Sequence, residues 1–141
     1  MTDAMATERR TLLRNGALFL LLSAMLGLVA AAQAPHPAKW MAAHVSGLLT
    51  GVLMIALGSL WSELRLAPGT RKRALQMGLI AAWTGFVANA YVATVNLPGP
   101  ATDPAGVPAA AWHLPVFLVM LAIVVPTTLG SFFLLWKGLR G

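Results

Sequence analysis

The chain has 141 residues, of which 58% are hydrophobic and only 10% are charged, and its formal net charge is +6. Soluble domains carry about 25% charged residues, so this composition excludes an ordinary soluble domain and indicates an integral membrane protein. The absence of cysteine excludes disulfides, thiolate catalysis and cysteine metal sites. The positive charge gathers on one side of the expected membrane, and we therefore predict no nucleic-acid partner.

Four apolar segments are long enough to span a bilayer, which takes about 20 residues. The expected transmembrane helices cover approximately residues 14–33, 41–62, 74–97 and 109–137. The short connections between them are typical of antiparallel neighbours. We therefore predict an all-α fold, in which a single domain forms a four-helix transmembrane bundle.

The first segment also resembles a signal peptide. Three arginines precede its apolar stretch, and the sequence Ala32-Gln33-Ala34 has the pattern of a cleavage site. Pro35 would follow the cut and disfavours cleavage. We therefore expect a retained helix.

Lysine and arginine are distributed unevenly over the expected loops. Only Lys39 lies on one side, and the other side has Arg9, Arg10, Arg14, Arg65, Arg71, Lys72, Arg73, Lys137 and Arg140. The positive-inside rule then places both termini in the cytoplasm, for a multi-pass protein of the cell inner membrane. Tryptophans fit an interfacial belt on this frame, with Trp40 and Trp112 at the outer surface and Trp61 and Trp136 at the inner one.

Polar side chains within the spans gather in the outer half of the membrane. They are His44, Asn89, Tyr91, Asn96 and His113. His44 is the one ionisable group deep within a span, and such a group is a functional-site hypothesis by default. We expect these side chains to form one site. Trp83 lies deeper, and both simple packing and a cofactor or substrate contact remain open for it.

Two polar faces are expected on the third helix. Asn89 and Asn96 align on one face, while Thr84, Tyr91 and Thr94 align on another. One of these faces is expected to meet a neighbouring subunit. The alternative is that Tyr91 belongs to the interfacial belt.

Several kinds of chemistry are compatible with His44. Haem ligation needs one histidine beside a flat apolar slot, which Gly47 and Gly51 would supply. The same glycines form a G-x-x-x-G pair that is also typical of close helix packing. General-base catalysis and a purely structural histidine are the other possibilities. His113 is a candidate second haem ligand, although its place beside Trp112 favours a position at the headgroups.

Three stretches of the chain resemble a known family. They are HVSGLLTGVLMIALGSLWSELRL (44–66), TGFVANAYVAT (84–94) and LLWKGLRG (134–141). They are similar to the small four-helix membrane proteins that comprise hydroxylaminobenzene mutase and the styrene oxide isomerases. The resemblance covers about the last 100 residues.

The resemblance implies a trimer with haem b between subunits and a second-helix histidine, here His44, as the iron ligand. Ferric iron would then act as a Lewis acid on the substrate oxygen, which Asn89 and Tyr91 would position. This chain has Thr50 where the resemblance predicts Asn. The implied function is a membrane isomerase or mutase that rearranges a small apolar aromatic epoxide or arylhydroxylamine. The alternatives are a non-enzymatic haem b electron-transfer protein that uses His44 and His113, and a cofactor-free protein with a structural His44.

Overall fold

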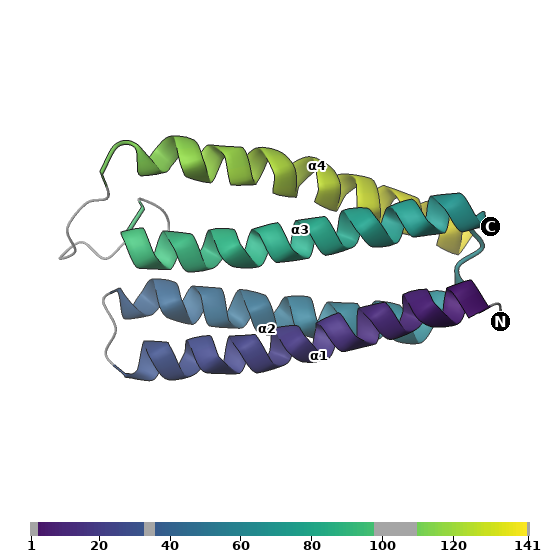
Figure 1. The fold of residues 1–141 in the computed structure, drawn as a ribbon, viewed down its shortest axis with the longest axis horizontal. Coiled ribbons are helices and arrows are strands. Elements are labelled where there is room, and N and C mark those ends of the chain that lie inside the picture. The colour runs from purple at the N-terminus through teal and green to yellow at the C-terminus, as the bar shows by residue number, and fades with distance from the viewer. Residues whose placement is uncertain (1–2, 33–35, 98–109, 141) are drawn as a thin grey trace.

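The computed structural model describes residues 3–32, 36–97 and 110–140 of the chain. They form four α-helices, and every one of these is long and apolar enough to cross a membrane (Figure 1). In chain order the elements are α1 (Asp3–Ala31), α2 (Pro37–Leu60), the 3-10 helix η1 (Trp61–Glu63), α3 (Pro68–Val95) and α4 (His113–Arg140). The predicted all-α fold is confirmed, and the chain is a multi-pass membrane protein.

The first three helices begin earlier than their apolar segments predicted. α1 begins at Asp3 instead of residue 14, and its polar first turns satisfy their side chains locally: the hydroxyls of Thr7 and Thr11 donate to the carbonyls of Asp3 and Thr7. α2 and α3 each begin with a proline, which suits the first helical turn because its missing N–H would have no partner there.

The fourth helix begins later than predicted. Residue 109, its expected start, lies outside the described residues, as does residue 33 at the expected end of the first helix. Residues 111–112 form a turn, and α4 begins at His113.

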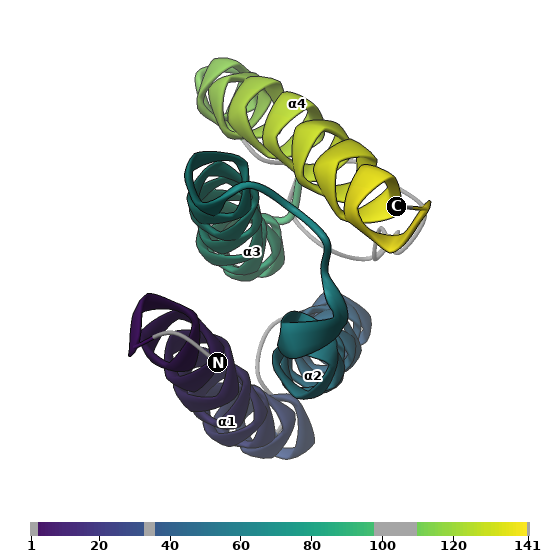
Figure 2. The same cartoon turned by 90° about the vertical axis from the view of Figure 1, so that its right-hand side faces the viewer.

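The helices are arranged as two antiparallel hairpins. α1 packs along α2, α3 packs along α4, and the hairpins meet chiefly through α2 and α3 (Figure 2). The start of α1, the η1 connection and the end of α4 all lie at one end of the bundle (Figure 1). This arrangement agrees with the prediction that both termini lie on one side of the membrane.

Small residues bring α1 and α2 close together. A Cβ atom on Gly51 would lie 2.9 Å from the carbonyl oxygen of Gly16, and one on Gly16 would lie 2.9 Å from the carbonyl oxygen of Gly51. A Cβ atom on Gly47 would overlap the hydroxyl of Ser23. Close backbone contact of this kind is typical of glycine pairs in membrane helices.

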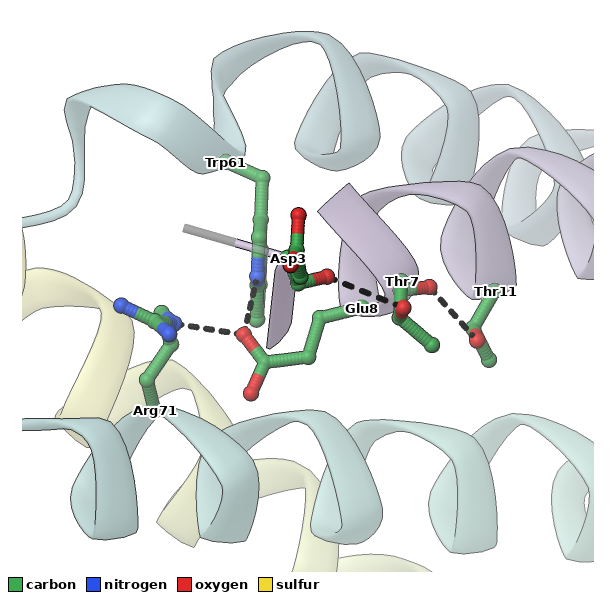
Figure 3. Close-up of polar contacts among 6 residues, drawn as sticks. All are labelled: Asp3, Thr7, Glu8, Thr11, Trp61 and Arg71. Atoms are coloured by element: carbon green, nitrogen blue, oxygen red, sulfur yellow. Dashed lines mark hydrogen bonds and ion pairs between the residues drawn. The ribbon is translucent and has the colours of Figure 1, made fainter. Parts of the chain in front are cut away.

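An ion pair between buried Arg71 and half-buried Glu8 joins α1 to α3 at the end that carries the termini (Figure 3). The Glu8 carboxylate accepts hydrogen bonds from Arg71 Nε at 2.5 Å and from Trp61 Nε1 at 3.0 Å. Trp61 is only 1% exposed and belongs to the apolar core at this end. Trp61 therefore lies at the end where it was predicted but packs inside the bundle, whereas Trp112 and Trp136 are exposed as a belt requires. The belt prediction missed Glu8 because it treated the residues before the first apolar segment as a loop.

Candidate functional site

His44 is half-buried on α2 and faces α1. Its Nδ1 lies 2.5 Å from the backbone carbonyl oxygen of Ser23. A carbonyl oxygen only accepts hydrogen bonds, so Nδ1 must be the atom that carries the proton. In the neutral imidazole, Nε2 then keeps a free lone pair.

The second nitrogen of His44 has no hydrogen-bond partner among the described residues. Nε2 is also not fully buried, unlike the partnerless polar atoms in the interior of the described part of the chain. Nε2 therefore keeps some exposure at the surface of the single chain.

The two glycines after His44 do not form an open slot. Both are buried, and the space beside them is filled by Ser23 and Phe86 at Gly47 and by Gly16 and Leu20 at Gly51. Within the single chain, these neighbours leave no flat groove beside the two glycines. These glycines serve helix packing, which is the alternative that the G-x-x-x-G spacing had left open.

An apolar cavity of about 280 Å³ lies between α2, α3 and α4. By comparison, an apolar cavity of about 150 Å³ is enough to bind benzene. Apart from α1 residue Leu12, its lining comes from α2, α3 and α4, and the polar members are Ser46, Thr50, Asn89, Thr128 and Ser131. A small aromatic molecule fits such a space by volume and polarity.

Asn89 is held by two hydrogen bonds at this cavity. Its Nδ2 donates to the Gly85 carbonyl oxygen at 3.0 Å and to Ser46 Oγ at 3.1 Å. The Gly85 carbonyl decides the orientation of the amide, because only the NH₂ end can bond to it. Asn89 therefore has only its oxygen, a hydrogen-bond acceptor, left for a ligand.

The structure does not bring the five predicted polar residues into one site. Tyr91 and His113 bond to one another, with the tyrosine hydroxyl 2.6 Å from Nδ1 of His113, and neither lines the cavity. Asn96 is buried and ends α3 in a left-handed conformation, a role in which asparagine is common. Asn89 alone faces the cavity, while His44 lies on a different side of α2.

Trp83 packs against α1. Its indole nitrogen donates to Asn15 Oδ1 at 3.0 Å, and its ring centroid lies 4.7 Å from that of Phe19. The packing interpretation of Trp83 therefore accounts for its position.

The number of metal-ligating side chains that lie close together limits the kind of metal or cofactor that the chain can hold. Across residues 3–32, 36–97 and 110–140, no three histidine, cysteine, aspartate or glutamate side chains gather closely enough to bind an ion. A site made of several protein ligands is therefore not formed there. A cofactor that supplies its own in-plane ligands needs one free imidazole nitrogen, and His44 Nε2 fits that requirement.

Sequence reasoning missed the residues of α1 that surround His44. Ser23 and Gly27 are one turn apart, so they lie on the same face of the helix. This spacing of small residues was the available signal, but nothing in it identified His44 as the neighbour.

Comparison with known proteins agrees with this architecture. The chain is similar to hydroxylaminobenzene mutase HabB of Ectopseudomonas oleovorans, with 31% identity over 87 residues. The aligned part is 62% of this chain and 51% of that protein, so the chain spans about half the length of the curated relative. No solved structure matches it. A family model described as styrene oxide isomerase matches residues 8–140, which include almost the whole four-helix bundle, and the chain belongs to that family.

Proposed function

We propose that the protein is a membrane isomerase or mutase that rearranges a small aromatic epoxide or arylhydroxylamine. The observation that carries this proposal is the apolar cavity beside Asn89, in a chain of this family. Such substrates partition into the bilayer, so a pocket between membrane helices is accessible to them. An intramolecular rearrangement needs a dry pocket, an electrophile and a few oriented hydrogen bonds.

We further propose that His44 holds haem b through Nε2. The proton on Nδ1 and the accessible Nε2 lone pair support this assignment. Histidine ligands of metals almost always donate their other N–H to a carbonyl or carboxylate. When bound, ferric haem supplies a Lewis acid for the substrate oxygen without net oxidation or reduction.

The side chains at the cavity contribute orientation and exclude water. The Asn89 oxygen accepts a hydrogen bond from the N–H or O–H group of an arylhydroxylamine. The apolar walls on α2, α3 and α4 hold the aromatic ring and keep water away. Tyr91 is proposed to position the substrate oxygen by family resemblance, and its hydroxyl is oriented by His113.

His44 and the cavity lie on different sides of α2, so a single chain does not place them together. We therefore propose a homo-oligomer, a trimer by family resemblance, in which neighbouring copies complete the site within the lipid. The charge distribution supports an inner-membrane location with both termini in the cytoplasm.

The first test is the visible spectrum of protein purified from haem-replete cells. We expect a Soret band in the wild type and its loss in His44→Ala, with the helical circular dichroism spectrum retained. A colourless wild type would leave His44 as a structural residue.

The second test incubates oxidised and dithionite-reduced protein with styrene oxide and with phenylhydroxylamine. Ferric iron accepts an oxygen lone pair better than ferrous iron, so turnover should fall strongly on reduction. Equal turnover in both states would rule out the Lewis-acid role, and no turnover of either substrate would overturn the proposed reaction.

The electron-transfer alternative requires His44 and His113 as a pair of axial ligands. Nδ1 of His113 bonds to the Tyr91 hydroxyl, and the imidazole stacks on Trp112 with 3.6 Å between ring centroids. His44 instead bonds to α1. The two imidazoles therefore bond to different helices, and no contact in the described part of the chain pairs them.

A further inference from the structure

We infer that helix α1 sets the tautomer and ring orientation of His44, with the Ser23 carbonyl and Gly27 as the positioning elements. This inference rests on the proposed function for its importance to haem, but its structural part stands on contacts within the chain. The two helices are neighbours along their length (Figure 2), so α1 forms a fixed wall beside the imidazole.

The first element is the carbonyl of Ser23. In a regular α-helix this oxygen also accepts the N–H of residue 27, but a carbonyl oxygen has two lone pairs and can serve both donors. The bond to Nδ1 at 2.5 Å therefore does not require α1 to open. It favours the tautomer in which Nε2 is unprotonated, which is the form that a metal binds.

The second element is the missing side chain at Gly27. A Cβ atom there would lie 2.8 Å from His44 Nδ1, 2.9 Å from Cε1 and 3.3 Å from Cγ. These atoms belong to the body of a rigid ring and not to the flexible end of a side chain. An alanine at this position would therefore push the imidazole away from α1 and break its bond to Ser23.

The two elements act together because the ring can reach the carbonyl only where α1 has no side chain in the way. Gly27 thus differs from Gly47 and Gly51, whose Cβ positions are filled by other residues and not by His44. The face of α1 around Ser23 and Gly27 works as a backbone support for the imidazole. In haem sites this support raises the basicity of the ligating nitrogen and fixes the plane of the ring.

The decisive experiment measures the tautomer in haem-free full-length protein. Protein labelled with ¹⁵N at histidine is studied by NMR in lipid, and the signals of His44 are assigned by their loss in His44→Gln. We expect a protonated Nδ1 and an unprotonated Nε2 in the wild type. A proton on Nε2 in the wild type would overturn the inference, and this outcome does not depend on whether any variant folds.

The variant Gly27→Ala should abolish this single tautomer. Two controls separate the effect from a general loss of structure. Ser23→Ala keeps the backbone carbonyl and should leave the tautomer unchanged. Gly69→Ala adds a methyl group that would meet no side chain or other helix within 4 Å. An unchanged tautomer in a folded Gly27→Ala protein would contradict the role of Gly27.

Haem titration then links the support to the cofactor. Loss of a partner that orients a metal ligand typically lowers affinity about 10–100-fold, and we expect a loss in this range for Gly27→Ala. Equal affinity of Gly27→Ala and wild type would contradict the role of α1 in haem binding. If the wild type binds no haem, the proposed cofactor fails, while the tautomer measurement still decides the positioning of His44.

Discussion

The hydroxyl of Tyr91 on α3 lies 2.6 Å from Nδ1 of His113, the first residue of α4. This bond joins the second hairpin at the end of the bundle opposite to the chain termini (Figure 1). It gives His113 a hydrogen-bond partner on the neighbouring helix.

We predict that His113→Ala leaves the haem spectrum unchanged, because His44 and not His113 is the proposed ligand. Its cost is the loss of one hydrogen bond, about 1 kcal/mol of unfolding free energy, which thermal unfolding in detergent would measure. Tyr91→Phe removes the same bond from the other side and should lower stability by a similar amount. A change from a low-spin to a high-spin spectrum in His113→Ala would instead identify His113 as an axial ligand.

Asn89 should discriminate between the two classes of substrate. Its NH₂ group is engaged by Gly85 and Ser46, so only its oxygen remains to bind a ligand. An arylhydroxylamine can donate a hydrogen bond to that oxygen, whereas an epoxide has no N–H or O–H to donate. Asn89→Ala should lower turnover of phenylhydroxylamine up to about tenfold, the equivalent of one hydrogen bond, without loss of haem.

The control for Asn89 is Thr94→Ala on the same helix. Thr94 is exposed, does not line the cavity, and bonds to its own helix at the Ala90 carbonyl. Thr94→Ala should leave the turnover of phenylhydroxylamine and of styrene oxide unchanged. An equal fall in styrene oxide and phenylhydroxylamine turnover in Asn89→Ala would argue against the acceptor role.

Gly47 should tolerate no side chain while Ser23 is present. An alanine Cβ at position 47 overlaps the Ser23 hydroxyl, and overpacking of this kind costs about 1–3 kcal/mol. The Ser23 hydroxyl is itself buried without a hydrogen-bond partner in the described part of the chain. Ser23→Ala should therefore be neutral or stabilising by itself.

The double variant Ser23→Ala/Gly47→Ala tests this pairing directly. It should recover much of the stability that Gly47→Ala loses, because the overlapping oxygen is gone. Chemical unfolding of the four proteins gives the coupling between the two sites. Simple additivity of the two single changes would show that another neighbour, such as Phe86, resists the methyl group.

The ion pair between Glu8 and Arg71 should contribute strongly to stability. Arg71 is only 4% exposed, and breaking a buried pair typically costs about 3–5 kcal/mol because the remaining charge is left without a partner. Glu8→Ala removes the acceptor of both Arg71 and Trp61 and should lower the unfolding free energy by about 3 kcal/mol. Glu63→Ala, which removes an exposed carboxylate nearby, is the matched control.

The same pair offers a second comparison. Replacing both partners with apolar residues, as in Glu8→Leu/Arg71→Met, should cost less than Glu8→Ala, because no buried charge remains. Thermal unfolding in a single detergent would compare the variants. A larger loss of stability in the double variant than in Glu8→Ala would mean that the two charged side chains stabilise the fold through contacts other than their ion pair.

The sequence by itself determined the class of protein, the four spans and their alternating direction. These follow from the length of the apolar segments, since a helix that crosses lipid must satisfy its own backbone and expose apolar side chains. His44 also stood out from the sequence, because an imidazole within a span is costly and rare. The spacing of Gly47 and Gly51 allowed two interpretations, close helix packing and a slot for haem.

Only the tertiary structure decided which neighbour each of these side chains meets. Periodicity places His44, Ser46 and Asn89 on particular faces of their helices. It does not tell which neighbouring helix covers each face. Ser23 lies 21 residues from His44, and Glu8 lies 63 residues from Arg71. Such contacts depend on how two hairpins pack, and apolar patterning specifies this poorly in a membrane protein, because lipid and a neighbouring helix are equally apolar surroundings.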